Sequence, residues 1–576
     1  MYLIKKLKQV PRKVWLIFIL VLTMLLIVLV TILAANVLGG GGGGPVVSTH
    51  CGKVRGRRNM SADGQEISEF LYIPYSGARV GERRWKHSSL IGGGDCWSGV
   101  YPADRDREIK CVQAYYTDPQ VGQEDCLHLS VRTPNISSSG LPVLVWIHGG
   151  SLSYGYAEEV GYSADTDFTA AVKSVTVNIN YRLDLLGFTS HPALWEDGES
   201  YGNFGINDAL TALQWVQTNI AAFGGDPRQV TIMGESSGGT IVLALVTAPK
   251  AQGLFQRAVS MSSAPLWKSS YEDAHMRRPD FLKHVNCDGL SSNAEVASCL
   301  KSADLELLIN AGTTANRGWG FYDFPLSDGE LGESMDYNVK EPFLLPYLPQ
   351  DIPDQKDRSG EVELILSNTA QENGFWWIFY DNNRVLNWTA AEELLRSRLD
   401  KFLGDKKQNL ETLLSEIKIR YNFGVNTEGW SPQKFWDTLT TDIRATCPMN
   451  ELAERLNTSP HLRVHRLYIE HRVSSAMDKG AGWGAWHGWD TEAMFGFKYY
   501  RGKHYNVTAK HDWELRDQLI ALTKQILKGE TKRWSPNDTI YLMNETPWRE
   551  SRTARPQSDL CEFWRDSGLS GWGWQN

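Results

Sequence analysis

The sequence lacks any run of five or more like charges beyond its N-terminal segment, and its formal net charge is -8. Nucleic-acid-binding surfaces are usually basic, so we expect no nucleic-acid partner. The cysteines include no Cys-x-x-Cys pair, the usual spacing of a structural zinc site, and we expect neither a metal nor a cofactor. Internal repeats are absent, and the one low-complexity tract is a glycine run at residues 39–44. A hydrophobic content of 42% therefore indicates an ordinary globular body rather than a repeat protein.

The N-terminus departs from this globular composition. Basic residues are frequent in the first thirteen positions, and residues 14–38 then carry no charge at all. A bilayer is spanned by about 20 apolar residues, whereas the apolar core of a signal peptide has about 7 to 15. The length therefore predicts a retained anchor, although small residues at 33–36 leave cleavage of a long signal peptide open. The basic flank predicts a single-pass type II membrane protein with its main domain extracellular or lumenal.

The predicted organisation follows from these boundaries. It comprises a cytoplasmic tail at 1–13, a transmembrane signal-anchor at 14–38, a glycine-rich linker at 39–50, a globular domain at 51–565 and a C-terminal tail at 566–576.

Two further features indicate export. Seven Asn-x-Ser/Thr sequons lie outside the anchor, and they are glycosylated only in a secretory lumen. They are Asn59, Asn135, Asn387, Asn457, Asn506, Asn537 and Asn544. The eight cysteines are an even number, which in an oxidising compartment favours disulfide bonds.

The pattern Gly-x-Ser-x-Gly, which places a nucleophilic serine on a sharp strand-to-helix turn, occurs twice. Ser236, in "GESSG", follows the short apolar strand predicted at Gln229–Met233 and precedes the helix predicted at Gly238–Ala248. Ser200, in "GESYG", is surrounded by charged and turn residues without an apolar strand. The context therefore predicts that Ser236 is the nucleophile and that Ser200 lies in a loop.

A second glycine motif lies upstream of this serine. The apolar strand predicted at Val143–Ile147 runs into "HGGS", where hydrolases with a nucleophile elbow place a glycine loop whose N–H groups bind an oxyanion. On its own, a Gly-Gly turn after a strand is more often an ordinary loop, and only its partners favour the functional interpretation.

Four segments together carry a family resemblance. They are "QEDCLHLSV" (123–131), "VNINYRLDLLGF" (177–188), the long block from "GNFGIND" to "GESSGG" (202–239) and "FPLSDGEL" (324–331). In these segments the chain resembles the type-B carboxylesterase/cholinesterase family, and the similarity runs from about Cys51 to Trp564. The resemblance implies an α/β-hydrolase fold, an α/β architecture with a large, mostly parallel central sheet flanked by helices.

The family orders its catalytic triad as Ser, Glu and His. The resemblance therefore implies that Ser236 is the nucleophile, that Glu372, after the apolar run "VELIL", orients the base, and that His487, in "WHGWD", is the base. It also implies an oxyanion hole built from the N–H groups of Gly150, Ser151 and Ser237, where Ser151 replaces the usual third glycine. If the pKa of His487 is unperturbed, activity should rise through about pH 6.5.

The resemblance further implies three disulfide bonds: Cys111 with Cys126, Cys287 with Cys299, and Cys447 with Cys561. Cys51 and Cys96 remain, and the simplest interpretation joins them to each other. Between Cys111 and Cys126 there is no tryptophan, where cholinesterases have the one that binds the choline cation. Choline specificity is therefore not expected, because tryptophan offers the best face for a cation.

Three functions share these residues. Hydrolysis of carboxylic esters is preferred, transfer of the same acyl group to another acceptor is the alternative, and adhesion by an inactive relative is disfavoured because all triad positions are present. The expected partners are a small-molecule ester and the membrane, reached through the N-terminal helix; formation of a homodimer is left open.

Overall fold

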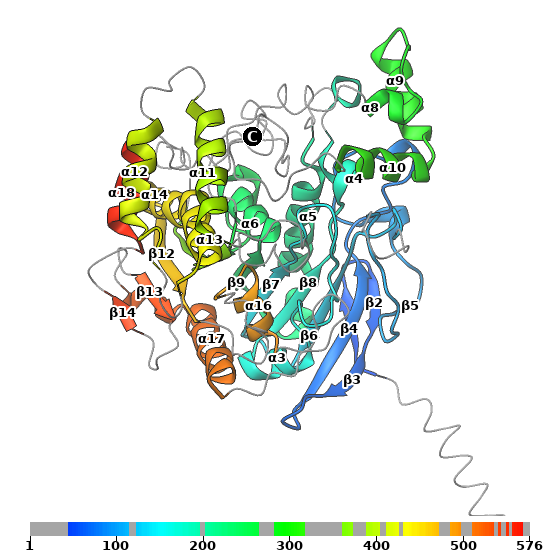
Figure 1. Cartoon of the computed structure of the whole chain (residues 1–576). Helices are drawn as coiled ribbons and strands as arrows, with labels where there is room; N and C mark the ends of the chain where they lie inside the picture. Colours follow the sequence, from blue (N-terminus) through cyan, green and yellow to red (C-terminus); the bar gives the residue numbers. More distant parts are fainter. Residues whose placement is uncertain are drawn as a thin grey trace, which may run out of the picture. The chain divides into compact units, whose positions relative to one another are not determined.

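The structure is a computed structural model of the chain. Its described residues form one large sheet of 11 strands (Figure 1). Its strand order is β14-β13-β12-β11-β10-β9-β7-β8-β6-β4-β3, and a smaller sheet has the order β1-β2-β5. The strands from β8 through β7, β9, β10, β11 and β12 to β13 pair in parallel, while the pairs at both edges are antiparallel. The mostly parallel sheet predicted from the sequence is thereby confirmed.

The strand bounds are β1 Val46–Thr49, β2 Gly52–Arg55, β3 Arg57–Met60, β4 Glu66–Pro74, β5 Val100–Pro102, β6 His128–Thr133, β7 Leu141–Ile147, β8 Val175–Ile179, β9 Gly225–Glu235, β10 Arg257–Met261, β11 Val362–Thr369, β12 Leu462–Ile469, β13 Thr539–Leu542 and β14 Arg549–Ser551. The helix bounds are α3 Thr166–Val172, α4 Asp184–Phe188, α5 Phe204–Asn219, α6 Ser237–Thr247, α8 Phe281–His284, α9 Asn293–Ser302, α10 Leu305–Asn316, α11 Trp388–Leu403, α12 Leu410–Arg420, α13 Pro432–Thr441, α14 Cys447–Leu456, α16 Trp489–Met494, α17 Lys510–Lys528 and α18 Ser558–Asp566.

The structure describes residues 44–113, 122–189, 191–195, 202–263, 281–316, 360–372, 387–403, 410–425, 430–471, 484–496, 510–534, 539–542, 549–551 and 556–567. The predicted anchor at 14–38 lies outside these ranges. Among the described helices, none has the length and apolar character that crossing a membrane requires. Strand β1 lies inside the range 39–50 that the sequence predicts as linker; its residues "VVST" are mostly β-branched, a composition that favours a strand.

Alternating side chains of the central strands supply two cores, one on each face of the sheet. On β7, Val143, Val145 and Ile147 belong to one buried cluster, whereas Leu144 and Trp146 belong to the other. Helices α5, α6 and α14 complete the first cluster, and α3, α16 and α17 complete the second. In Figure 1, α5 and α6 lie above the strands and α3 and α17 below them. Coverage of both faces explains why β7 is apolar throughout rather than alternating with polar residues.

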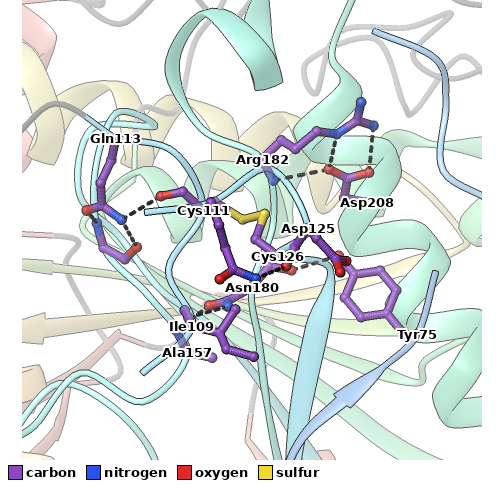
Figure 2. The surroundings of a disulfide bond; sticks show 12 residues. Tyr75, Ile109, Cys111, Gln113, Asp125, Cys126, Ala157, Asn180, Arg182 and Asp208 are labelled. Atoms are coloured by element: carbon purple, nitrogen blue, oxygen red, sulfur yellow. Dashed lines mark hydrogen bonds and ion pairs between the residues drawn. A yellow bond between two sulfur atoms is a disulfide. The ribbon is translucent and has the colours of Figure 1, made fainter. Parts of the chain in front are cut away.

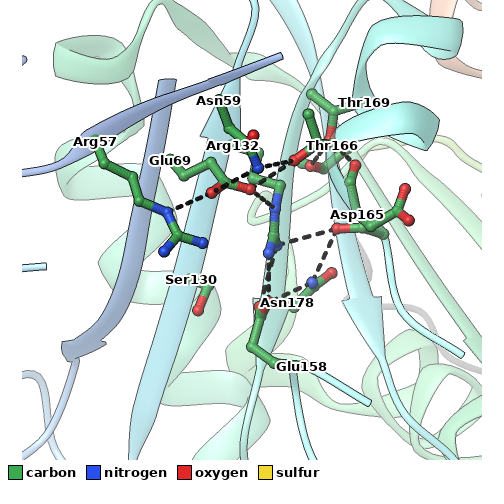
Figure 3. A network of polar contacts seen from close by, with 12 residues as sticks. Arg57, Asn59, Glu69, Ser130, Arg132, Glu158, Asp165, Thr166, Thr169 and Asn178 are labelled. Carbon is green, nitrogen blue, oxygen red and sulfur yellow. Dashed lines mark hydrogen bonds and ion pairs between the residues drawn. The ribbon is translucent and has the colours of Figure 1, made fainter. Parts of the chain in front are cut away.

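A buried network of charged side chains ties the antiparallel edge of the sheet together (Figure 3). Glu69 on β4 accepts hydrogen bonds from Arg57 Nε on β3 (2.7 Å) and from Arg132 Nε on β6 (2.9 Å). Arg132 also binds Glu158, which accepts from Asn178 Nδ2 on β8 at 3.1 Å. Burial raises the pKa of Glu69, but the positive charge of Arg132 and the other donors outweigh it, and the pKa falls to about 2. Because Glu158 follows β7, the network also fixes the segment that leads away from the glycine loop.

Candidate active site

Ser236 is the single residue between the end of β9 and the start of α6. Its backbone is strained, with φ 55° and ψ -127°, as expected for a serine lifted above the edge of a sheet. The helix then packs closely against β7: a Cβ on Gly238 would lie 2.2 Å from the backbone oxygen of Ile147. The sequence analysis predicted a helix opened by small residues, and at position 238 only glycine fits. Ser200 lies outside the described residues, so its location in a loop stays a prediction.

Glu372 follows β11, whose carboxyl end lies at the same edge of the sheet as that of β9 because the two strands are linked in parallel through β10. Its Oε1 accepts hydrogen bonds from Ser262 Oγ at 2.8 Å and from the backbone N–H of Thr369 at 2.7 Å. Its Oε2 lies 2.5 Å from Nδ1 of His487. One carboxylate oxygen is therefore held by the scaffold, and the other is directed at the imidazole.

His487 is placed by a loop rather than by the end of a strand. Gln371 joins this loop to β11: its backbone N–H donates to Ala485 O at 2.9 Å, and its side-chain oxygen accepts from Ala485 N at 2.8 Å. The neighbouring Trp486 and Trp489 are buried in the second core cluster. The imidazole itself is 16% exposed, so the structure fixes the histidine while leaving it open to a substrate.

Three carboxyl groups surround this histidine. Glu235, adjacent to Ser236 and fully buried, lies 3.3 Å from His487 Nε2 through Oε1, and Glu372 lies on the Nδ1 side. Burial lowers the pKa of His487, but the negative charges of Glu235, Glu372 and Asp490 outweigh it and raise the pKa to about 9. Asp490 is also buried, and burial followed by the charge of Glu372 raises its pKa to about 7. The pKa near 6.5 that an unperturbed histidine would have is therefore not found here.

The glycine loop lies beside the serine turn. A Cβ on Gly149 would lie 3.1 Å from Cβ of Ser236, and Gly150 adopts φ 109°, where a Cβ would lie 2.1 Å from Tyr154 O. Ser151 has φ 56°, so the residue that replaces the third glycine takes a left-handed conformation despite its side chain. Leu152 N donates to Ser237 Oγ at 3.0 Å, which joins the glycine loop to the first turn of α6.

The N–H groups of this loop are available to a substrate oxygen. Within the described part of the chain, no residue accepts a hydrogen bond from the N–H of Gly150 or Ser151. The N–H of Ser237 belongs to the first turn of α6, where helix N–H groups have no intrahelical acceptor. The three groups that the resemblance implied for an oxyanion hole therefore lie on two segments that contact each other.

The disulfide bond between Cys111 and Cys126 lies close to Gln113, a residue that contacts the chain just after the glycine loop (Figure 2). Gln113 follows Cys111, which is bonded to Cys126, and its Nε2 donates to Gly155 O at 3.2 Å. In return, Gly155 N donates to the side-chain oxygen of Gln113 at 3.0 Å. The covalent loop thus fixes the chain shortly after the candidate oxyanion residues.

Four disulfide bonds are present among the described residues. They join Cys51 with Cys96, Cys111 with Cys126, Cys287 with Cys299, and Cys447 with Cys561, the same pairs that the sequence analysis gave. The loop between Cys111 and Cys126, in which the sequence has no tryptophan, lies mostly outside the described residues.

Sequence reasoning missed three residues that shape the site: Glu235, Ser262 and Gln371. Glu235 occupies a variable position of the serine motif, and its proximity to His487 depends on the reversal of the chain at Ser236. Ser262 follows β10, and the parallel pairing of β10 with β9 and β11 would have placed it at the same edge. Gln371 stands next to Glu372, and nothing local to its sequence indicates the bridge to residue 486.

Comparisons with known proteins give a family and three relatives to which this chain is similar. Residues 43–559 match the model of a family described as the carboxylesterase family. Acetylcholinesterase of Leptinotarsa decemlineata is 26% identical over 567 residues, covering 90% of this chain and 85% of that protein. Esterase E4 of Myzus persicae is 31% identical over 409 residues, covering 66% of this chain and 71% of that protein. Esterase FE4 of the same organism is 31% identical over 409 residues, covering 66% and 69%.

Proposed function

Because the chain belongs to the carboxylesterase family and is a carboxylic ester hydrolase, we propose that Ser236, His487 and Glu372 cleave a small-molecule ester through an acyl-enzyme intermediate. The observation that carries the proposal is the 2.5 Å contact between His487 Nδ1 and Glu372, made at the edge of the sheet where Ser236 stands on its turn.

The proposed reaction has two halves. In the first, Ser236 Oγ attacks the carbonyl carbon while Nε2 of His487 takes the hydroxyl proton, and the same nitrogen then protonates the departing alcohol. In the second, His487 removes a proton from water, which attacks the acyl-enzyme and releases the acid. Glu372 keeps the proton of the imidazole on Nδ1 and stabilises the cation that forms in each half.

The negative oxygen of each tetrahedral intermediate is proposed to bind the N–H groups of Gly150, Ser151 and Ser237. A donor of this kind contributes about 10² to 10³ in rate, because it is already oriented when the charge develops. Two observations support this role: Gly150 and Ser151 both have positive φ values, and no described residue accepts a hydrogen bond from either N–H group.

The pH dependence tests the proposal through the charge on His487. The base acts only when neutral, and its pKa is raised to about 9, so kcat/KM for an uncharged ester should rise with pH through a limb near 9. Glu235→Gln removes a negative charge 3.3 Å from Nε2 and should move this limb to lower pH.

The control is Glu361→Gln, which changes an exposed glutamate directly before β11. It should leave the pH of the rising limb unchanged. A wild-type limb at pH 6.5, or a limb unmoved by Glu235→Gln, would show that these carboxylates do not set the pKa of the working base.

We further propose that the hydrolase is held by an uncleaved anchor at residues 14–38, with its catalytic domain on the extracellular or lumenal side. N-terminal sequencing of protein purified from membranes should begin in the first residues of the chain. A sequence starting near Asn36 would contradict the anchor.

The same topology predicts which sequons carry glycans. Asn59 is exposed, but its Nδ2 already donates to Thr166 Oγ1 at 3.3 Å, and it should be modified only in part. Asn135 and Asn387 are exposed and should be modified. Asn457 should not, because its Nδ2 donates to Val464 O at 3.2 Å while its Oδ1 accepts from Val464 N at 3.0 Å. Glycopeptide mapping reads each site separately; unmodified asparagine at both Asn135 and Asn387 would argue against passage through the secretory lumen. The remaining sequons, Asn506, Asn537 and Asn544, lie outside the described residues.

A further inference from the structure

A second cluster of chemically versatile side chains lies apart from the triad. His471 follows the end of β12, and His511 and Asp512 lie in the first turn of α17. One nitrogen or oxygen from each of these residues falls within 4.8 Å of the other two. His471 and Asp512 are 41 positions apart in sequence, so no short metal-ligand motif predicts the cluster.

The distances fit ligands that share one small cation. Nε2 of His471 lies 3.2 Å from Asp512 Oδ1, and Nε2 of His511 lies 3.6 Å from the same oxygen. Zinc binds histidine nitrogen and carboxylate oxygen at about 2.0 to 2.2 Å in tetrahedral geometry, which separates neighbouring ligand atoms by about 3.3 to 3.6 Å.

The carboxylate supplies an independent observation. The side chain of Asp512 is fully buried, and among the described residues no donor reaches its Oδ2. Burying a carboxylate with an oxygen that no donor reaches is costly, and a cation bound to the same carboxylate lowers this cost by neutralising its charge. His511 is 45% exposed, which gives an ion a path from solvent.

We propose that His471, His511 and Asp512 bind one Zn²⁺, with water completing its coordination. Two imidazoles and a carboxylate suit zinc better than magnesium or calcium, which prefer oxygen ligands alone. The ion cross-links the end of β12 to the start of α17, and α17 packs against α16, the helix that follows His487. It therefore acts as a structural clamp beside the catalytic histidine loop, and it replaces the expectation from sequence that the chain holds no metal.

The test uses the full glycosylated protein, purified without a polyhistidine tag and stripped with a chelator. Calorimetric titration with ZnCl₂ should give one site per chain, and Zn²⁺ should raise the unfolding temperature. His511→Ala should weaken zinc binding by at least about tenfold and abolish the rise, because one of three protein ligands is lost. Because His511 is partly exposed, this variant should keep its metal-free unfolding temperature, which is measured alongside.

His284→Ala is the matched control, since it removes an exposed histidine from α8. It should bind zinc as the wild type does. Asp512→Asn provides a second variant that keeps the side-chain shape, and it should also weaken binding. Absence of a stoichiometric site in the wild type, or equal zinc affinity in wild type and His511→Ala, would overturn the proposal.

Discussion

Ser236→Ala should lower kcat for ester hydrolysis by about 10⁶, because the variant has no hydroxyl to form the acyl-enzyme. Alanine is small and meets the same left-handed strain as serine at φ 55°, so the fold should be retained. Residual turnover above the uncatalysed rate should come from the oxyanion N–H groups and from substrate binding alone. Steady-state kinetics on an activated ester, with the unfolding temperature as a check on the fold, measures both.

The matched control is the second serine of the same pattern. Ser200→Ala should leave kcat within experimental error of the wild type, because its flanking sequence has no strand to present a nucleophile. Equal activity of Ser236→Ala and wild type would remove Ser236 from the mechanism, and loss of activity in Ser200→Ala alone would assign the role to the other motif.

Glu372→Gln should lower kcat by about 10⁴, the loss typical of a triad whose histidine is held in the wrong tautomer. The amide oxygen can take the place of Oε1, where it still accepts from Ser262 Oγ and Thr369 N. The amide NH₂ group then faces Nδ1 of His487, which must become an acceptor. Its proton moves to Nε2, the nitrogen that has to take the proton of Ser236.

Glu361→Gln makes the same chemical change on an exposed glutamate beside β11 and should be neutral. Ser262→Ala is expected to fall between the two, because it removes one of the two donors that fix Glu372 and leaves the carboxylate in place. If Glu372→Gln retained a kcat within about tenfold of wild type while folding normally, another group would have to orient the histidine.

The nucleophile turn could be predicted from sequence because its determinants are local. An apolar strand, a serine between glycines and a small-residue helix all fall within a short stretch, and the structure places Ser236 between β9 and α6 as that pattern indicates. The strand is longer than the predicted Gln229–Met233. Its first residues are polar, but Gly225 pairs with Leu141 of β7, so sheet pairing overrides local composition.

The surroundings of the histidine could not be predicted in this way. Family resemblance suggested Glu372 and His487, but their contact spans 115 positions and depends on the bridge that Gln371 makes to the histidine loop. The charge environment was missed for the same reason. Glu235 approaches Nε2 only because the chain reverses at Ser236, and this contact contributes to a histidine pKa of about 9 rather than 6.5.

The proposed zinc ligands show the limit of sequence reasoning most clearly. Each residue alone looks like a surface or structural side chain, and they meet only because α17 begins beside the end of β12. Long-range packing decides such clusters, and no periodicity or spacing in one sequence encodes them.

Reaction with a fluorophosphonate, followed by peptide mass spectrometry, tests the central claim most directly. The probe forms a covalent bond only with a serine activated by a neighbouring base, so it reports the working triad without knowledge of the natural ester. The account predicts one adduct per chain, on Ser236, that is lost in Ser236→Ala and slowed in Glu372→Gln. An adduct on Ser200, or no adduct in a folded and glycosylated sample, would contradict it.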